Sequence, residues 1–212
     1  MTEKLDLVIS INRYSALLPL TIFFIRSKSL LTSQKWLAGP IIWAAMSELI
    51  GYCTAYYLET NLPFYHLYVA IEFSLLVVVF YNAYPGLISK KYLIYSIPLF
   101  CISAVLNVLL FQPLTDFASH TRTLESCILL FLSIRYFFLV LKELKVKNIE
   151  RTFAFWFSTA ILVYFSSNLL LFIYSNVIMV EEHSTFMEVW AMHSLLNILL
   201  YLFYAIALWQ KE

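Results

Sequence analysis

The chain of 212 residues is 62% hydrophobic and only 13% charged, and its mean hydropathy is +0.80. A soluble domain is about 45–50% apolar and about 25% charged, so this composition excludes an ordinary soluble protein. The net charge of +1 shows no basic excess of the kind that binds nucleic acid, so we expect no nucleic-acid partner.

The apolar residues are concentrated in seven runs, each close to the roughly 20 residues that a helix needs to cross a lipid bilayer. These runs are continuous and do not alternate with polar residues, which favours helices over strands. In chain order they are Leu5–Ile25, Trp36–Tyr57, Phe64–Tyr84, Tyr92–Phe111, Thr121–Lys142, Thr152–Val177 and Phe186–Trp209. We therefore predict an all-α, polytopic membrane protein, with residues 1–212 forming a single domain of seven transmembrane helices.

Two prolines lie inside predicted spans. Pro19 falls in the first span and Pro98 in the fourth. Proline cannot donate the backbone hydrogen bond that a helix requires, and its ring displaces the preceding turn. We therefore expect both helices to be kinked.

The basic residues of the connections predict the orientation. Ten lie on one side of the membrane: Arg26, Lys28, Lys35, Lys90, Lys91, Lys142, Lys145, Lys147, Arg151 and Lys211. The other side has only Lys4 and Arg122. Because Lys and Arg accumulate in cytoplasmic loops, the N-terminus is expected outside and the C-terminus in the cytoplasm, as a multi-pass protein of the cell inner (plasma) membrane.

Polar side chains recur at one depth of the predicted bundle. Glu48 lies nine residues before the outer end of its span, and Glu72 lies eight residues after the start of the next one. Both carboxylates are then about 12–14 Å below the outer surface. Arg13, Asn168 and His193 lie seven to nine residues from the outer ends of their spans, at about 10–14 Å. We expect these groups to form one polar layer.

Helical spacing extends this layer along two spans. Residues three or four positions apart share one face of a helix. The two sets are Tyr65, Tyr68 and Glu72, and His193, Asn197 and Tyr201. The predicted ligand-binding residues of an outward-facing polar cavity are therefore Arg13, Glu48, Tyr68, Glu72, Asn168, His193 and Asn197.

This layer has a functional and a structural interpretation. A charge at mid-membrane costs about 2.5–3.5 kcal/mol, so these side chains should face the bundle interior. Arg13 would then hold an anionic group or balance the two carboxylates. Glu48 and Glu72 would bind a cation or take up and release a proton. Alternatively, the layer joins helices through hydrogen bonds of about 0.6–2 kcal/mol each, and Asn168 and Asn197 fit that role.

Enzymatic chemistry has less support in the sequence. His66, His193 and the two carboxylates could ligate zinc, and "HSLLN" at residues 193–197 resembles the H-x-x-x-H motif of the alkaline ceramidase and adiponectin-receptor superfamily. Here Asn197 replaces the second histidine, and the chain has only four histidines. The last span has no lysine for a retinal Schiff base, and no G-x-S-x-G motif occurs. We therefore expect no catalytic residue, metal or cofactor.

Two segments carry a resemblance to a group of proteins. "YHLYVAIEF" at Tyr65–Phe73 and "HSLLNILLY" at His193–Tyr201 are similar to segments of uncharacterised bacterial seven-helix membrane proteins. Those proteins look like the sensor portions of membrane-bound kinases. The resemblance implies a seven-helix fold and a sensing role without the kinase, so signalling would need a separate protein at the cytoplasmic loops.

Three functions are consistent with these features. The favoured one is a binding or sensing module whose cavity takes a small polar ligand or protons. The first alternative is a small transporter that uses Glu48 and Glu72 as a proton-coupled pair. The second, less favoured, is a membrane-embedded metal hydrolase. Proton-dependent uptake would indicate transport, and stoichiometric bound metal would indicate an enzyme.

Overall fold

The structure, a computed structural model, describes residues 2–143, 148–179 and 183–211. The described residues form helices and no strands, which confirms the predicted all-α class. The elements are α1 (Thr2–Ser15), α2 (Leu17–Arg26), α3 (Thr32–Lys35), α4 (Ala38–Leu58), α5 (Leu62–Ala83), α6 (Lys90–Leu110), α7 (Ser119–Glu143), the 3-10 helix η1 (Ile149–Arg151), α8 (Phe153–Ile178) and α9 (His183–Trp209).

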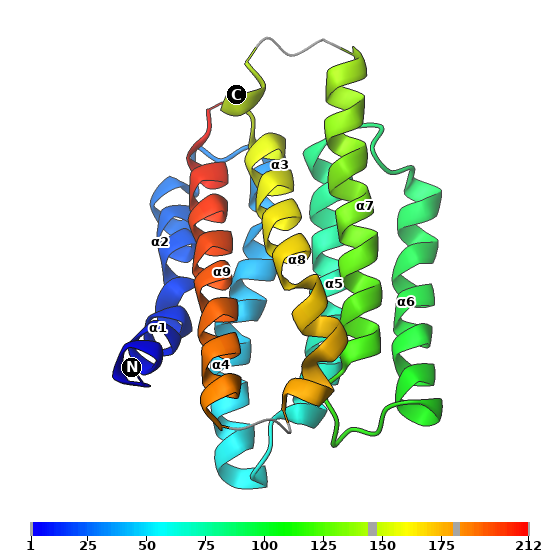
Figure 1. Cartoon of the computed structure of the whole chain (residues 1–212). Coiled ribbons are helices and arrows are strands. Elements are labelled where there is room, and N and C mark those ends of the chain that lie inside the picture. The colour runs from blue at the N-terminus through cyan, green and yellow to red at the C-terminus, as the bar shows by residue number, and fades with distance from the viewer. Residues whose placement is uncertain (1, 144–147, 180–182, 212) are drawn as a thin grey trace.

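The long helices run side by side as an elongated bundle (Figure 1). The α5 helix packs against α4, α6 and α7, and α8 packs between α7 and α9. Helices from the two ends of the chain meet, because α1 and α2 pack against α9. We call the end that holds the α4–α5 and α6–α7 connections the lower end, as drawn in Figure 1, and the end near the C-terminus the upper end.

Six helical segments are long and apolar enough to cross a membrane. They are Glu3–Arg26, Leu62–Ala83, Lys90–Leu110, Ser119–Glu143, Phe153–Ile178 and Thr185–Trp209. Their outward faces carry exposed apolar side chains, such as Leu99 and Leu109 on α6, which suit contact with lipid tails. The predicted span Trp36–Tyr57 corresponds to α4, which has 21 residues and is not among these six.

The first predicted span is broken near its middle. The α1 helix ends at Ser15 and α2 begins at Leu17, with Ala16 in a turn between them. Pro19 has no N–H to donate to the carbonyl of Ser15 four residues earlier, so the helical ladder is interrupted there. The predicted distortion at Pro19 is therefore present, whereas α6 continues without a break through Pro98.

Aromatic rings fill the upper half of the bundle. Phe80 of α5 contacts Phe157 of α8, with ring centroids 4.8 Å apart, and Phe157 stacks on Phe153 and on Tyr204 of α9. All four rings are buried. This close packing leaves no room for a ligand at the level of these four rings.

The connection between α6 and α7 is folded back onto the lower end. The Asn176 side chain of α8 accepts a hydrogen bond from the Phe117 N–H (2.8 Å) and donates one to the Phe117 carbonyl (3.0 Å). Gln112 bonds both Asn107 of α6 and Ser119 of α7. These side chains replace the backbone partners that the connection lacks, and they hold Phe117 against the bundle.

Candidate functional site

A cavity of about 480 Å³ lies in the lower half of the bundle. This volume is within the range of about 300–1,000 Å³ that is typical of small-molecule sites. Residues of α1, α4, α5, α7, α8 and α9 line it, together with Phe117 of the α6–α7 connection. Along α4 the lining extends from Ala55 to Ala44, a depth of about 16 Å. The cavity therefore reaches from the lower end deep into the bundle.

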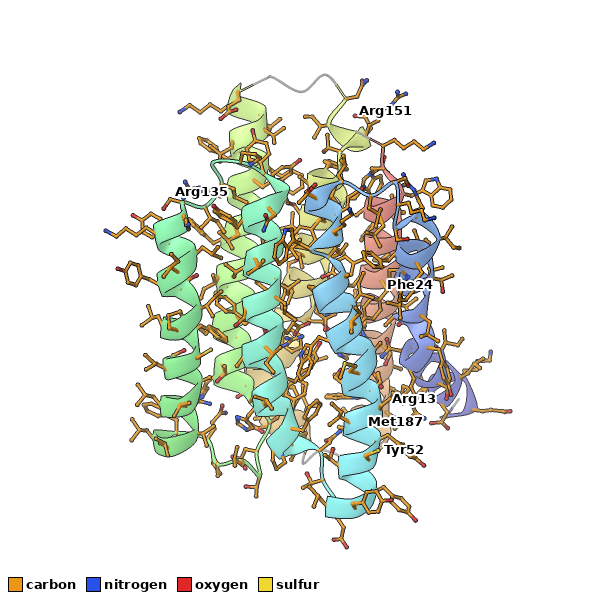
Figure 2. The ribbon with its side chains drawn as sticks, turned by 180° about the vertical axis from the view of Figure 1, so that it is seen from behind. Arg13, Phe24, Tyr52, Arg135, Arg151 and Met187 are labelled. Atoms are coloured by element: carbon orange, nitrogen blue, oxygen red, sulfur yellow. The ribbon has the colours of Figure 1, made fainter. Side chains whose placement is uncertain are left out.

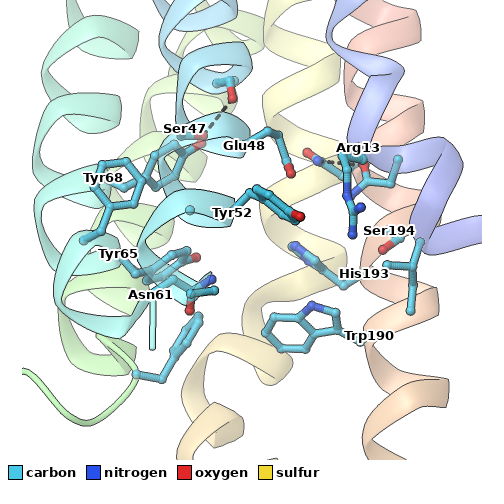
Figure 3. Close-up of a pocket in the computed structure, with 18 of the residues that line it drawn as sticks. Arg13, Ser47, Glu48, Tyr52, Asn61, Tyr65, Tyr68, Trp190, His193 and Ser194 are labelled. Carbon is cyan, nitrogen blue, oxygen red and sulfur yellow. Dashed lines mark hydrogen bonds between the residues drawn. The ribbon is translucent and has the colours of Figure 1, made fainter. Parts of the chain in front are cut away.

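Two opposite charges face each other across this cavity (Figure 3). Arg13 comes from α1 and Glu48 from α4, and Tyr52 lies one turn beyond Glu48. Neither charged side chain forms an ion pair shorter than 4.0 Å with a residue that the structure describes. The positive charge of Arg13 nevertheless acts on the Glu48 carboxylate at longer range. Both groups are exposed at the cavity and can receive a ligand.

His193 of α9 lines the cavity opposite Glu48, and Asn168 of α8 fixes its ring through a hydrogen bond. Its Nδ1 is 3.0 Å from Oδ1 of Asn168, and the Asn168 Nδ2 donates to the carbonyl of Tyr164 (2.9 Å). Because the Asn168 amide nitrogen donates to the Tyr164 carbonyl, its Oδ1 is left to accept a hydrogen bond from the Nδ1–H of His193. A neutral imidazole then has its lone pair on Nε2, so His193 can accept a hydrogen bond from a ligand.

Asn197 stands one turn after His193 and joins two helices at the cavity wall. Its Nδ2 donates to Oδ1 of Asn12 on α1 (2.9 Å). Asn12, Asn197 and Tyr201 all line the cavity. Asn197 therefore joins α9 to α1, as the structural interpretation expects, and it also lines the cavity.

A buried ion cluster lies at the inner edge of the cavity, where Arg122 and Tyr164 are part of the lining. Arg122 of α7 donates through Nη1 to Glu72 of α5 and to Glu125 of α7 (2.6 Å), and through Nη2 to the Tyr164 hydroxyl (3.3 Å). Arg122 is 2% exposed and Glu125 is fully buried. One positive charge is thus shared by two carboxyl groups within the bundle.

Aromatic rings surround the Arg122 guanidinium. Its Cζ lies 4.7 Å from the centroid of Phe172, 5.2 Å from Phe165 and 5.9 Å from Tyr68. Ring faces attract a cation, and the apolar surroundings strengthen each charge interaction in the cluster. The cluster is therefore a rigid joint between α5, α7 and α8.

Tyr68 connects this cluster to the cavity. Its hydroxyl donates to Glu72 (2.9 Å), on the carboxylate that also binds Arg122, and its ring lines the cavity. The Tyr68 ring stacks between Trp43 of α4 and Tyr65 of α5, with centroids 6.1 and 5.7 Å away. A molecule that touches the Tyr68 hydroxyl is thus one hydrogen bond from Glu72.

The structure brings together most of the predicted site residues. Those that line the cavity are Arg13, Glu48, Tyr68, His193 and Asn197. Glu72 and Asn168 are absent from the lining and are buried behind it, where they hold Arg122 and His193. That these residues bind a ligand stays a prediction.

Sequence reasoning missed Arg122. The sequence places Arg122 in an outer connection and predicts that Arg13 balances the Glu72 carboxylate. Instead Arg122 is buried and is the ion-pair partner of Glu72. The signal was the spacing of Arg122, Glu125 and Ser126 at i, i+3 and i+4, which places all three on one helix face.

The histidines and acidic residues considered for zinc are dispersed. His66 contacts the carbonyl of Asp116 (3.0 Å), and His193 contacts Asn168. Among the residues that the structure describes, no three His, Cys, Asp or Glu side chains are grouped so that they could hold a metal ion. No family model, curated protein or solved structure gives a significant match to this chain.

Proposed function

We propose that this protein spans the membrane seven times and binds a small polar ligand in its cavity from the outside, as a sensing module. The span that adds to the six apolar segments is α4, the second in chain order, whose 21 residues extend about 31 Å, enough to cross the hydrocarbon core. Its polar residues Ser47, Glu48 and Tyr52 line the cavity, while Leu49 and Ile42 are exposed apolar side chains. The low hydropathy of α4 therefore reflects its place at the cavity.

The proposed orientation puts the lower end outside. Arg135 and Arg151 lie toward the upper end in Figure 2, whereas Arg13 and Tyr52 lie toward the lower end. The upper connections carry nearly all the basic residues of the loops. The sequence predicts two basic residues, Lys4 and Arg122, on the outer side. Because Arg122 is buried in an ion cluster, only Lys4 remains as a basic residue of an outer loop. This asymmetry supports a cytoplasmic upper end.

The orientation predicts which loops a membrane-impermeant thiol reagent reaches in intact cells. Single cysteines at Glu59 and at Lys91, in a chain whose Cys53, Cys101 and Cys127 are changed to serine, are the matched pair. We expect labelling at Glu59 from outside and labelling at Lys91 only after the cells are opened. Lys145–Lys147 and Glu181–Glu182, for which the sequence makes the same predictions, lie outside the described residues. Outside labelling at Lys91 would refute the orientation.

The observation that carries the binding function is the convergence of polar groups on one cavity. Arg13, Glu48, His193 and Asn197 come from three helices and face the same space. A few converging polar groups within an aromatic lining are typical of ligand sites. Ionisable residues within membrane-spanning helices are also costly, and for that reason they are rare and usually mark a functional site.

A path from the cavity to the proposed cytoplasmic side supports sensing. Tyr68 at the cavity bonds Glu72, and Glu72 bonds Arg122 of α7. The α7 helix runs from this cluster to the upper end, and the sequence that follows it contains Lys145 and Lys147. A ligand that shifts Tyr68 would bias the position of α7, and a separate signalling protein at the basic loops would read that shift.

The test is a steric variant that fills the cavity. A Cβ added at Gly51 meets only the tip of Asn61, 3.9 Å away, so Gly51→Phe directs a ring into the cavity without removing a polar group. Met46→Phe, at an exposed position of the same helix, is the control. Thermal unfolding of the purified full chain is measured with a panel of amino acids, amines and organic acids.

We expect at least one compound to raise the unfolding temperature saturably in wild type and Met46→Phe and to fail with Gly51→Phe. Equal stabilisation of Gly51→Phe would show that the cavity is not the site. If proteoliposomes accumulated the same compound under a proton gradient, the protein would be a transporter and not a sensing module.

A further inference from the structure

We infer that the cavity takes a zwitterion, whose anionic group binds Arg13 and whose cationic group binds Glu48. This inference rests on the proposed ligand-binding function and specifies the chemical class of the ligand. Arg13 and Glu48 point toward each other from α1 and α4 across the cavity (Figure 3). Each lies in a helical segment at the level of the bilayer, where an unpaired charge is costly. A molecule with both charges compensates both residues at once.

A ligand with one charge fits the cavity less well. An anion would bind Arg13 and leave Glu48 unpaired, and a simple cation would do the reverse. Arg122 also lines the cavity, but it is 2% exposed and its charge is already shared by the two carboxyl groups of Glu72 and Glu125. The charges open to an occupant are therefore one positive and one negative, and they stand on opposite walls.

The rest of the lining matches the two halves of such a ligand. Tyr52 lies on the Glu48 side with its ring exposed, and ring faces bind ammonium groups, quaternary ones included. On the Arg13 side lie His193 and Ser194 of α9, the helix against which α1 packs. The Ser194 hydroxyl can donate to an anionic group.

The cavity wall between α1 and α4 bears on where the zwitterion comes from. The α1 helix packs against α9, whereas α2 makes the contact of the N-terminal segment with α4. Arg13 of α1 and Glu48 and Tyr52 of α4, which face the cavity between these two helices, are all exposed. A free zwitterion from the aqueous side and the headgroup of a zwitterionic lipid from the bilayer share the same chemistry, and the experiment separates them.

The experiment compares matched probes on the purified full chain. Glycine betaine carries both charges, choline carries the same ammonium without the carboxylate, and acetate carries only the carboxylate. The lipid arm places the protein in nanodiscs of phosphatidylethanolamine or of the anionic phosphatidylglycerol and measures retained lipid by native mass spectrometry. The readouts are the shift in unfolding temperature and the concentration at half-saturation.

We expect glycine betaine or phosphatidylethanolamine to stabilise the wild type saturably, and choline, acetate and phosphatidylglycerol to be without effect at the same concentrations. Arg13→Ala and Glu48→Gln should each weaken binding about tenfold or more. Arg135→Ala, which removes an exposed arginine of α7 remote from the cavity lining, should leave it unchanged. The paired exchange Arg13→Glu with Glu48→Arg should restore part of the affinity, because a zwitterion can bind in the reversed direction.

The two sources give different patterns, and both support the zwitterion. Stabilisation by free glycine betaine in detergent assigns an aqueous ligand, and retention of phosphatidylethanolamine without an effect of betaine assigns a lipid. The inference is overturned if no zwitterion stabilises the chain, or if choline or acetate alone binds as tightly. In the latter case, loss of that binding in Gly51→Phe would keep the proposed binding function and remove only the ligand class.

Discussion

Replacing Arg122 with methionine is expected to lower the free energy of unfolding by about 3–5 kcal/mol. The guanidinium is 2% exposed and is shared by Glu72 and Glu125, so its removal leaves two buried carboxyl groups without a cation. Methionine keeps much of the side-chain volume, so the loss reports charge and hydrogen bonding more than a cavity. Unfolding of the purified protein by heat or by sodium dodecyl sulfate measures the change.

Arg135→Met on the same helix is the matched control. Arg135 is exposed, and its replacement should cost less than about 1 kcal/mol. The triple variant Arg122→Met, Glu72→Gln and Glu125→Gln should recover most of the lost stability, because the uncompensated charges are gone. A loss at Arg122 no larger than at Arg135 would show that the cluster contributes little to the fold.

The helices of this protein could be predicted from the sequence because each apolar run is long and ends at polar or helix-breaking residues. The predicted span Phe64–Tyr84 corresponds to α5 at Leu62–Ala83, and Thr152–Val177 corresponds to α8 at Phe153–Ile178. The break at Pro19 also follows from local chemistry, since it depends on a missing backbone N–H. The helix boundaries are local properties, and the sequence contains what determines them.

The partner of Glu72 could not be predicted, because it depends on how far neighbouring helices are displaced along their axes. Glu72 lies ten residues after the start of α5, whereas Arg122 lies three residues after the start of α7. Their contact means that the two starts differ in level by about 10 Å. A depth counted from the end of each span assumes that all spans begin together, and α5 and α7 do not.

The folded connection between α6 and α7 explains the burial of Arg122. Phe117 is fixed by Asn176, and Gln112 bonds Ser119 at the start of α7. These tertiary contacts cover the first turn of α7, so a residue that reads as interfacial in the sequence lies inside the bundle. By contrast, the bond between Tyr68 and Glu72 spans one turn of a single helix, and that spacing is visible in the sequence.

The last prediction concerns how Glu72 and Glu125 divide the negative charge that Arg122 compensates. One arginine and two carboxylates leave a surplus negative charge in an apolar surrounding, which favours one ionised and one neutral carboxyl group. Glu72 accepts from Arg122 through one oxygen and from Tyr68 through the other. Glu125 accepts from Arg122 through Oε2, while its Oε1 has no hydrogen-bond partner. We therefore expect Glu72 to be ionised and Glu125 to be neutral.

Glu125→Gln should then change the free energy of unfolding by less than about 1 kcal/mol, whereas Glu72→Gln should cost about 1.5–3 kcal/mol. The double variant should lose at least about 1 kcal/mol more than the sum of the two, because Glu125 can ionise and pair with Arg122 in Glu72→Gln, whereas the double variant leaves Arg122 without a carboxylate. Thermal unfolding gives the three values, and infrared spectroscopy should show a protonated carboxyl band in the wild type that disappears in Glu125→Gln. Equal costs for the two single variants, or a band that persists in Glu125→Gln, would place the charge differently and contradict this division.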